Sequence, residues 1–231
     1  MFAIRQRFRG VQDFTERQRA ALESTVVFLR AATAELVEAG ATLARAFRAQ
    51  AAAEGEVPWA DAATIGQLLA AGVPQVDTGL AVAARALVTE PGVLERVRGG
   101  ELDVEQVAEE AMRLHPPFLA IFAWVTEPCD CLGVPLAPGT PVVVDVAAVN
   151  ADPARVPDPA AFCPVRGKGA TYTFGKGAHY CLGAGSARVQ IAAGLRGLLA
   201  SGRALSVDAS GLRLDSDGYS QTARALPYTL R

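Results

Sequence analysis

The most informative segment of the sequence is Thr173-Phe174-Gly175-Lys176-Gly177-Ala178-His179-Tyr180-Cys181-Leu182-Gly183. It leads into an expected helix at Ala184–Ala200. Its glycines can adopt positive φ, and because they lack a Cβ they let the backbone approach a large flat ligand closely. The sulfur of Cys181 would lie near free N–H groups and the positive end of the helix dipole, which favour a thiolate. The segment therefore predicts a ligand-binding loop. A glycine-rich loop with a buried structural cysteine is the competing interpretation.

The complete string resembles the cysteine loop of the cytochromes P450, Phe-x-x-Gly-x-x-x-Cys-x-Gly. The matching residues are Phe174, Gly177, Cys181 and Gly183. The resemblance implies a haem b cofactor (iron protoporphyrin IX) with Cys181 as the thiolate ligand of its iron, a ligand that favours O–O cleavage. It also implies that Phe174 shields the sulfur, that Gly175 lies at the haem with the matching glycines, and that His179 bonds a haem propionate. A solvated loop histidine is the alternative for His179.

Two further motifs appear upstream in the order that this family has. Glu110-Ala111-Met112-Arg113 matches Glu-x-x-Arg and is followed by Leu114-His115-Pro116-Pro117. The i, i+3 spacing places Glu110 and Arg113 on one helix face, where they can pair. Phe162-Cys163-Pro164-Val165-Arg166 matches Phe-x-Pro-x-Arg, so the resemblance implies a buried network of Glu110, Arg113 and Arg166. A planar guanidinium suits such a network better than lysine does, and its role would be to lock the cysteine loop.

The central helix departs from the family pattern at the position expected to lie over the iron. The family has Ala-Gly-x-Asp/Glu-Thr there, an acid–alcohol pair that delivers protons, whereas this chain has Ala71-Gly72-Val73-Pro74-Gln75. Gln75 is therefore one candidate, and Asp77-Thr78, one helical turn later, is the alternative. If neither serves, proton delivery is impaired and a peroxide-driven route becomes more plausible.

The rest of the chain predicts a mainly α fold with a small β region, a truncated P450-like fold. Helical periodicity predicts a first long helix at Thr15–Ala53, unbroken or interrupted near Gly40. The later elements are, in order, a helix at Asp61–Glu90 kinked at Pro74, a short helix within Pro91–Gly100, a helix at Asp103–Leu114, a β region at Pro117–Val149 with a turn at Ala137–Thr140, a loop at Asn150–Gly169, and short strands at Ala204–Arg231. We divide the chain into a weakly matched N-terminal helical segment, 1–60, and a haem-thiolate domain, 61–231.

Composition excludes several classes of function. A net charge of −2 argues against a nucleic-acid partner or an anionic membrane surface. The sequence contains no run of about 18 apolar residues that would span a membrane. The arginine-rich start has no apolar core behind it, as a secretory signal would, and the four cysteines form no regular framework, so we expect a cytoplasmic protein with free thiols.

The resemblance implies a haem-thiolate monooxygenase that inserts oxygen into a small hydrophobic organic substrate. Electrons would come from a ferredoxin or a flavoprotein reductase. Lys176, Arg188 and Arg196 could form part of a basic patch on which this donor docks. The alternative is that these three cations are simply solvated at the surface. The resemblance begins near Asp61, and the chain has little more than half the usual length of the family. One edge of the haem would therefore be open unless a partner chain or oligomer covers it.

Two other functions compete with this one. A truncated or degenerate homologue would be inactive alone, would need a partner chain, or would be driven by peroxide. An arginine that usually contacts a propionate is also replaced near Ala123-Trp124, which supports degeneration. A zinc site of Cys129, Cys131 and either Cys163 or His115 is the third interpretation, although its spacing is poor for structural zinc.

Overall fold

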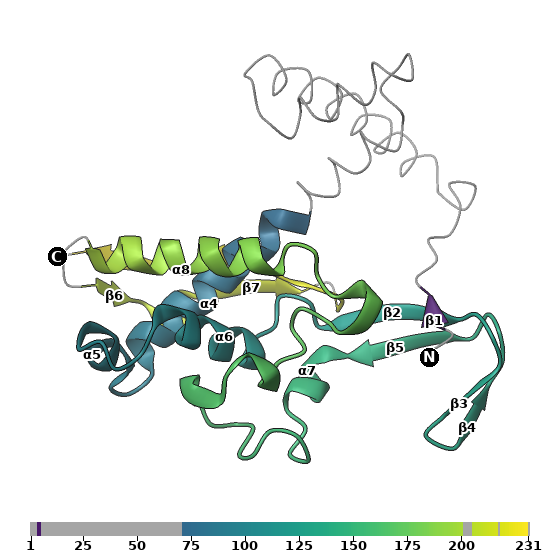
Figure 1. The fold of residues 1–231 in the computed structure, drawn as a ribbon. Helices are drawn as coiled ribbons and strands as arrows, with labels where there is room; N and C mark the ends of the chain where they lie inside the picture. The colour runs from purple at the N-terminus through teal and green to yellow at the C-terminus, as the bar shows by residue number, and fades with distance from the viewer. Residues whose placement is uncertain (1–3, 6–70, 201–204, 217, 231) are drawn as a thin grey trace, which may run out of the picture. The chain divides into compact units, whose positions relative to one another are not determined.

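The computed structural model describes residues 4–5, 71–200, 205–216 and 218–230 (Figure 1). The chain divides into two units, 1–6 with 73–231, and 7–72. The first of these units contains the cysteine loop. The predicted helix at Thr15–Ala53, most of the part of Asp61–Glu90 that precedes Pro74, and the proposed boundary at residue 60 lie outside the described residues.

Most of the α-helices in the described part follow the sequence signals closely. They are α4 (Pro74–Thr89), α5 (Val93–Arg98), α6 (Val104–Leu114), α7 (Val146–Asn150) and α8 (Ala184–Ala200). Val73 interrupts the helix and Pro74 takes the first position of α4, where its missing N–H costs no hydrogen bond, so the predicted distortion at Pro74 is confirmed. Asp103 caps α6, and its backbone N–H donates to Gln106 Oε1 over 2.9 Å.

Helices α4, α6 and α8 pack together and form the core. Glycine allows a close approach where α4 and α8 meet. A Cβ on Gly79 would lie 2.6 Å from Ile191 Cδ1, and one on Gly194 would lie 2.8 Å from Leu80 Cδ1. The core is built from small and branched apolar side chains, fully or almost fully buried: Val82, Ala83, Leu87, Val107, Ala111, Met112, Ile191 and Leu195. This close packing gives the cysteine loop, which precedes α8, a rigid base.

In the described ranges the strands form four small antiparallel sheets. Strand β2 (Ala120–Val125) pairs with β5 (Pro141–Asp145) and with the two-residue β1 (Ile4–Arg5). A hairpin of β3 (Cys129–Cys131) and β4 (Val134–Leu136) projects beyond the β2–β5 ribbon (Figure 1). The predicted turn at Ala137–Thr140 is confirmed, since Thr140 N–H donates to Ala137 O over 3.1 Å between β4 and β5.

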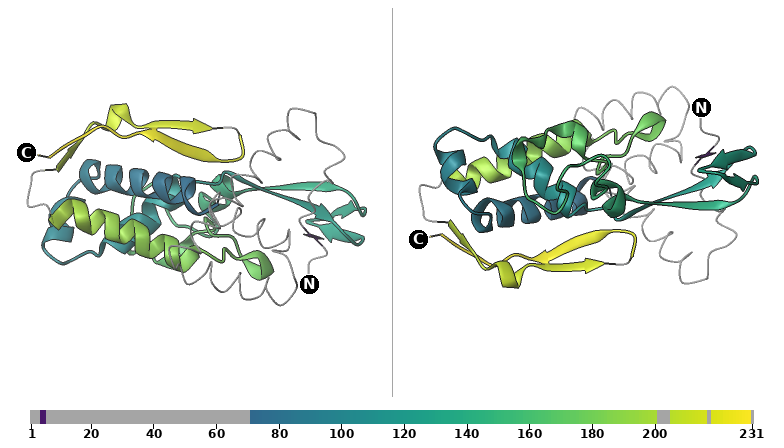
Figure 2. Two further views of the ribbon diagram at one scale, coloured as in Figure 1. Left: turned by 90° about the horizontal axis from the view of Figure 1, so that it is seen from above. Right: turned by 90° about the horizontal axis from the view of Figure 1, so that it is seen from below.

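The C-terminal strands lie along α4, on the side away from α8 (Figure 2). They are β6 (Leu205–Val207), β7 (Arg213–Ser216), β8 (Gln221–Ala225) and β9 (Tyr228–Leu230), paired β6 with β9 and β7 with β8. This confirms the prediction of short strands at the end of the chain. Helix α4 is therefore covered by helices on one side and by strands on the other.

Helix α7 corrects the sequence prediction, which placed its residues partly in the β region and partly in a loop. Asp145 accepts a hydrogen bond from the Ala148 N–H over 2.9 Å and so caps α7 directly after β5. The helix has only five residues, too few for a helical period to show, and two of them are valines. No helix in the described part of the chain is long and apolar enough to cross a bilayer.

Candidate functional site

The cysteine loop is closed by its own backbone. The Cys181 N–H donates to Phe174 O over 2.9 Å, and Ala184 N–H donates to Cys181 O over 3.2 Å as the chain enters α8. Gly175 and Gly177 have φ of 71° and 73°, a conformation that strains any residue with a side chain. The thiol of Cys181 is exposed. The predicted sequence of glycine loop, cysteine and helix is thus present, with the sulfur accessible.

The loop leaves open space where its glycines lie. A Cβ on Gly177 would meet no atom within 4 Å, and one on Gly175 would meet only His179 O, at 3.7 Å. A Cβ on Gly183 would come within 3.8 Å of the Cys181 sulfur. His179 ends the short 3₁₀ turn Gly177–His179 and is exposed. Of the predicted glycines, Gly183 therefore lies beside the Cys181 sulfur, and Gly177 borders open space.

Glu110, Arg113 and Arg166 contact one another, as the motifs predict. Arg113 Nε and Nη2 each donate to one oxygen of the Glu110 carboxylate over 2.9 Å, and Arg166 Nε donates to Oε1 over 3.1 Å. Arg113 and Glu110 are almost completely buried, so their charges interact in a medium of low dielectric. Glu110 Oε1 also accepts from the Cys163 N–H over 2.9 Å.

The same arginines hold the loop that runs from α7 to the cysteine segment. Arg113 donates to Asn150 O and Pro159 O over 2.9 Å each, and Arg166 donates to Pro157 O and to Asp158 O. The network therefore fixes the path of an irregular segment through its carbonyl groups. Its contacts are with the protein itself, and a direct role towards a cofactor stays a prediction.

A second polar cluster, which the sequence did not reveal, anchors the start of the cysteine loop. The Asn150 side chain is buried, donates to Arg113 O over 3.1 Å and accepts from the Tyr172 N–H over 2.7 Å. Thr173 Oγ1 donates to Met112 O over 2.9 Å and lies 2.7 Å from Thr171 Oγ1. These bonds tie the loop to the last turn of α6, where carbonyl groups have no partner within the helix.

We predict that Asn150→Ala destabilises the chain by about 1–3 kcal/mol, because Tyr172 N–H and Arg113 O would each lose a partner in a buried place. Urea unfolding measures the loss. Asn150→Asp keeps the acceptor for Tyr172 and is the matched variant, while Ser210→Ala, at an exposed turn, is the control. A loss in Asn150→Ala no larger than in Ser210→Ala would refute the anchoring role.

The candidate catalytic residues of α4 lie in three different environments. Asp77 is exposed, whereas Thr78 is buried and its hydroxyl faces strand β8. Thr78 Oγ1 accepts from Ala223 N–H over 2.9 Å and lies 2.9 Å from Pro74 O and 3.2 Å from Gln221 O. The structure therefore does not bring Asp77 and Thr78 together as a pair, because consecutive helical residues do not face each other.

Gln75 differs from both. Its Oε1 is buried and makes no hydrogen bond in the part of the chain that the structure describes. A buried amide oxygen without a partner costs free energy, which is unusual in a folded protein. Of the three candidates, only Thr78 has a side chain whose hydrogen bonds to the described fold are shown, and Gln75 is the one with a buried oxygen that lacks a partner there.

The predicted basic patch is mostly engaged in ion pairs. Arg188 pairs with Glu109 and Arg196 pairs with Glu105, both between α8 and α6. Burial alone would lower the pKa of Arg188, but the hydrogen bonds to Glu109 and to the Tyr180 hydroxyl outweigh that effect and raise the pKa. Lys176 lies 5.2 Å from the centre of the Tyr172 ring. Arg188 and Arg196 are thus both engaged in ion pairs, and a docking role of the patch stays a prediction.

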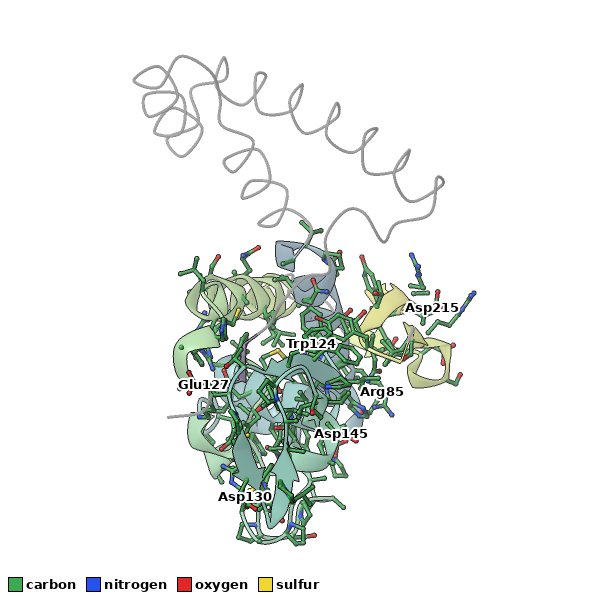
Figure 3. The ribbon with its side chains drawn as sticks, turned by 90° about the vertical axis from the view of Figure 1, so that its right-hand side faces the viewer. Arg85, Trp124, Glu127, Asp130, Asp145 and Asp215 are labelled. Atoms are coloured by element: carbon green, nitrogen blue, oxygen red, sulfur yellow. The ribbon has the colours of Figure 1, made fainter. Side chains whose placement is uncertain are left out.

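Two other predictions concern residues outside the loop. Ala123 and Trp124 lie on β2, whose six residues include no arginine, and Figure 3 labels Trp124. Among the residues that the structure describes, no three His, Cys, Asp or Glu side chains come close enough to hold a metal ion. The zinc interpretation is therefore not supported.

Comparisons with known proteins agree with this geometry. The family model described as cytochrome P450 matches residues 104–201, which include α6 and the whole cysteine loop. The structure of CYP108D1 from Novosphingobium aromaticivorans is similar, with a TM-score of 0.78 and 26% identity over 92% of this chain and 52% of that one. The C-terminal part of this chain belongs to the cytochrome P450 family.

A curated relative and a second solved structure match over shorter parts of the chain. The 2-hydroxy-5-methyl-1-naphthoate 7-hydroxylase of Streptomyces carzinostaticus is 34% identical over 114 residues, which are 48% of this chain and 28% of the hydroxylase. Cytochrome P450 CYP150A6 of Mycobacterium marinum has a TM-score of 0.67 at 24% identity, over 74% of this chain and 44% of that one, and supports the fold. The chain thus spans about half, or less, of the length of the P450 proteins that it matches.

Proposed function

We propose that this chain is the haem-bearing part of a P450 monooxygenase that inserts oxygen into a small hydrophobic organic substrate. The observation that carries the proposal is the accessible thiol of Cys181, on a loop closed by the bond from its N–H to Phe174 O. The naphthoate hydroxylase from Streptomyces carzinostaticus, whose name states the addition of a hydroxyl group to an organic acid, supports this reaction class.

The residues present fit a haem. A large flat ligand needs a stretch of backbone that it can approach closely, and Gly177 offers one because a Cβ there would meet no atom within 4 Å. Cys181 would bind the iron, Phe174 and the glycines at 175, 177 and 183 would lie against the ring, and His179 would bond a propionate. When bound, the haem supplies the activation of the oxidant.

The chain's own residues have two tasks in this proposal. The Phe174 carbonyl holds the Cys181 backbone, so the sulfur keeps one direction. Glu110, Arg113 and Arg166 hold the segment that precedes the loop, which keeps the sulfur preorganised and does no chemistry. A ferredoxin or flavoprotein reductase would supply electrons on the Cys181 face.

Aromatic side chains support an apolar substrate. The Tyr219 ring lies 5.2 Å from the Phe118 ring and 5.4 Å from the Phe122 ring, centre to centre, and Phe122 is 42% exposed. Binding of an apolar molecule over exposed aromatic surface of this kind is favourable, because it removes apolar area from water. We infer that a small hydrophobic compound, aromatic or aliphatic, would be held here.

A second candidate function follows from α4. Thr78 is engaged with β8 and Asp77 is exposed, so the chain has no described acid–alcohol pair for proton delivery. The alternative is a haem-binding homologue that uses dioxygen poorly, is driven by peroxide, or needs a partner chain to complete its haem site. Gln75 is then the residue available to position water or oxidant.

The reduced, carbon monoxide difference spectrum of the purified chain with haem tests the proposal. A red-shifted thiolate Soret band is the expected result. A histidine-type spectrum, or no haem uptake, would refute the assignment of this chain as the haem-bearing part.

We predict different effects for substitutions of Gln75 and Thr78. Thr78→Ala removes the acceptor of the buried Ala223 N–H and should cost about 1–3 kcal/mol in urea unfolding, while Thr78→Ser should keep most of the stability. Gln75→Ala should leave stability within about 0.5 kcal/mol and lower the yield of product per electron pair consumed. If Thr78→Ser and Gln75→Ala both give as much product per electron pair as the wild type, Gln75 has no catalytic role.

A further inference from the structure

Arg188, in the second turn of α8, has three partners at once. Its Nε donates to Glu109 Oε1 and its Nη2 to Glu109 Oε2, the latter over 3.4 Å. Its Nη1 donates to the Tyr180 hydroxyl over 3.0 Å, and its guanidinium carbon lies 4.3 Å from the centre of the Phe174 ring. Phe174 and Tyr180 are at opposite ends of the segment that closes on Cys181. One side chain therefore contacts both ends of the cysteine loop.

Glu109 completes the arrangement from the other side. Its side chain is only 8% exposed, so a charge there needs a close partner, and Arg188 is 17% exposed. Glu109 and Glu110 are consecutive residues of α6, but their carboxylates face different segments. Glu110 holds the loop that precedes the cysteine segment, through Arg166 and Cys163 N–H. Glu109 holds, through Arg188, the segment that contains the cysteine.

The chemistry of the three contacts requires a guanidinium. A planar cation can lie flat over an aromatic ring while its N–H groups point outward in the plane to two different acceptors. Lysine keeps the charge but has no plane to stack and no fixed fork of donors. Charged hydrogen bonds in a partly buried place are also stronger than those on the surface.

We propose that Arg188 is a positioning residue, oriented by Glu109, which holds Phe174 and Tyr180 and thereby fixes the backbone bond between Cys181 N–H and Phe174 O. The consequence for the iron ligand rests on the proposed function. The consequence for the loop does not, because all of the partners belong to the protein. Arg188 touches neither the sulfur nor, by this proposal, the substrate.

The same helix interface supplies a matched control. Arg196 of α8 pairs with Glu105 of α6, two turns of α8 further from the loop. It is more exposed than Arg188, at 58% against 17%, and no contact joins it to a described residue of the cysteine loop. Arg196→Gln therefore removes a cation from the α6–α8 interface without touching Phe174 or Tyr180.

Amide hydrogen exchange of the whole chain without haem tests the positioning role. In Arg188→Gln, the Cys181 and Tyr180 amides should exchange about 5- to 30-fold faster than in the wild type, as expected for the loss of one or two good contacts. The amide of Leu87, in the core of α4, should be unchanged, which separates a local effect from general loss of stability. Arg196→Gln should exchange like the wild type at all three positions.

Arg188→Lys keeps the charge and guards against a variant that does not fold. It should show the same direction of change at Cys181, since the stack on Phe174 and the fork of donors are lost. Wild-type exchange at Cys181 in Arg188→Lys, or equal exchange in Arg188→Gln and Arg196→Gln, would overturn the proposal.

The haem-loaded chain gives a second and separate readout. The ferrous carbon monoxide complex of Arg188→Lys should contain a larger fraction without the thiolate band than that of Arg196→Gln. Equal fractions would overturn the extension to the iron ligand. If the wild-type chain itself shows no thiolate band, the proposed function fails, and the exchange experiment still decides whether Arg188 positions the loop.

Discussion

Replacement of Cys181 by alanine is expected to abolish the thiolate Soret band of the ferrous carbon monoxide complex. The alanine side chain has no atom that can donate to iron, and no other cysteine lies within the loop. The effect is all or none, because ligation requires the sulfur itself. Titration with haem followed by reduction under carbon monoxide measures it.

The control for this experiment is Cys131→Ala. Cys131 is exposed like Cys181, but it lies on β3 in the projecting hairpin. Its loss should leave the band unchanged and would show that reactive thiols in general are not responsible. An unchanged band in Cys181→Ala would contradict the assignment of the ligand.

Arg113→Ala is expected to cost about 3–5 kcal/mol in stability, a large share of the roughly 5–15 kcal/mol that holds a typical domain together. The substitution leaves the buried Glu110 carboxylate without its two-point partner and also frees the carbonyls of Asn150 and Pro159. Glu110→Ala should have an effect of similar size, since two arginines and the Cys163 N–H lose their acceptor. Urea unfolding followed by far-UV circular dichroism gives the free energies.

An exposed ion pair is the control for the buried network. Arg224 and Asp215 pair over 2.8 Å on the C-terminal hairpin, with side chains 60% and 57% exposed. Arg224→Ala should change stability by at most about 1 kcal/mol. If Arg113→Ala does not fold, Glu110→Gln keeps the shape and removes only the charge. A loss in Glu110→Gln as small as in Arg224→Ala would refute the structural role of the network.

The sequence predicted the parts of the site whose residues lie close together along the chain. Cys181 and the glycines follow one another in a single string, and Glu110 and Arg113 lie one helical turn apart. Each of these signals is contained within a few residues, so spacing alone was enough to place it on a loop or on a helix face.

The missed residues make contacts far along the chain. Asn150 meets Arg113 at a separation of 37 residues, and Arg188 meets Glu109 at a separation of 79. No local period marks a polar residue whose partner is on another element. A faint signal was present at Glu109, a second carboxylate beside the motif and on the buried face of α6. For Arg188 the sequence indicates a docking cation or a solvated one, because position in a helix does not show which neighbour covers a side chain.

Thr78 shows the same limit in the other direction. Its place next to an aspartate in α4 suggested a catalytic pair, but its hydroxyl is held by Ala223 N–H of β8, 145 residues later. A strand far along the chain thus determines where the Thr78 hydroxyl points, and its catalytic role stays a prediction.

The two consecutive glutamates of α6 have a consequence for the order in which the molecule folds. Glu110 reaches Cys163 and Arg166, 53 and 56 residues later, and Glu109 reaches Arg188 after 79. Contacts so distant in sequence are slow to form because chain entropy must be lost before they exist. We therefore expect the cysteine loop to form late, after α6 has docked, so that a nascent chain acquires the geometry of this loop only once α8 has been synthesised.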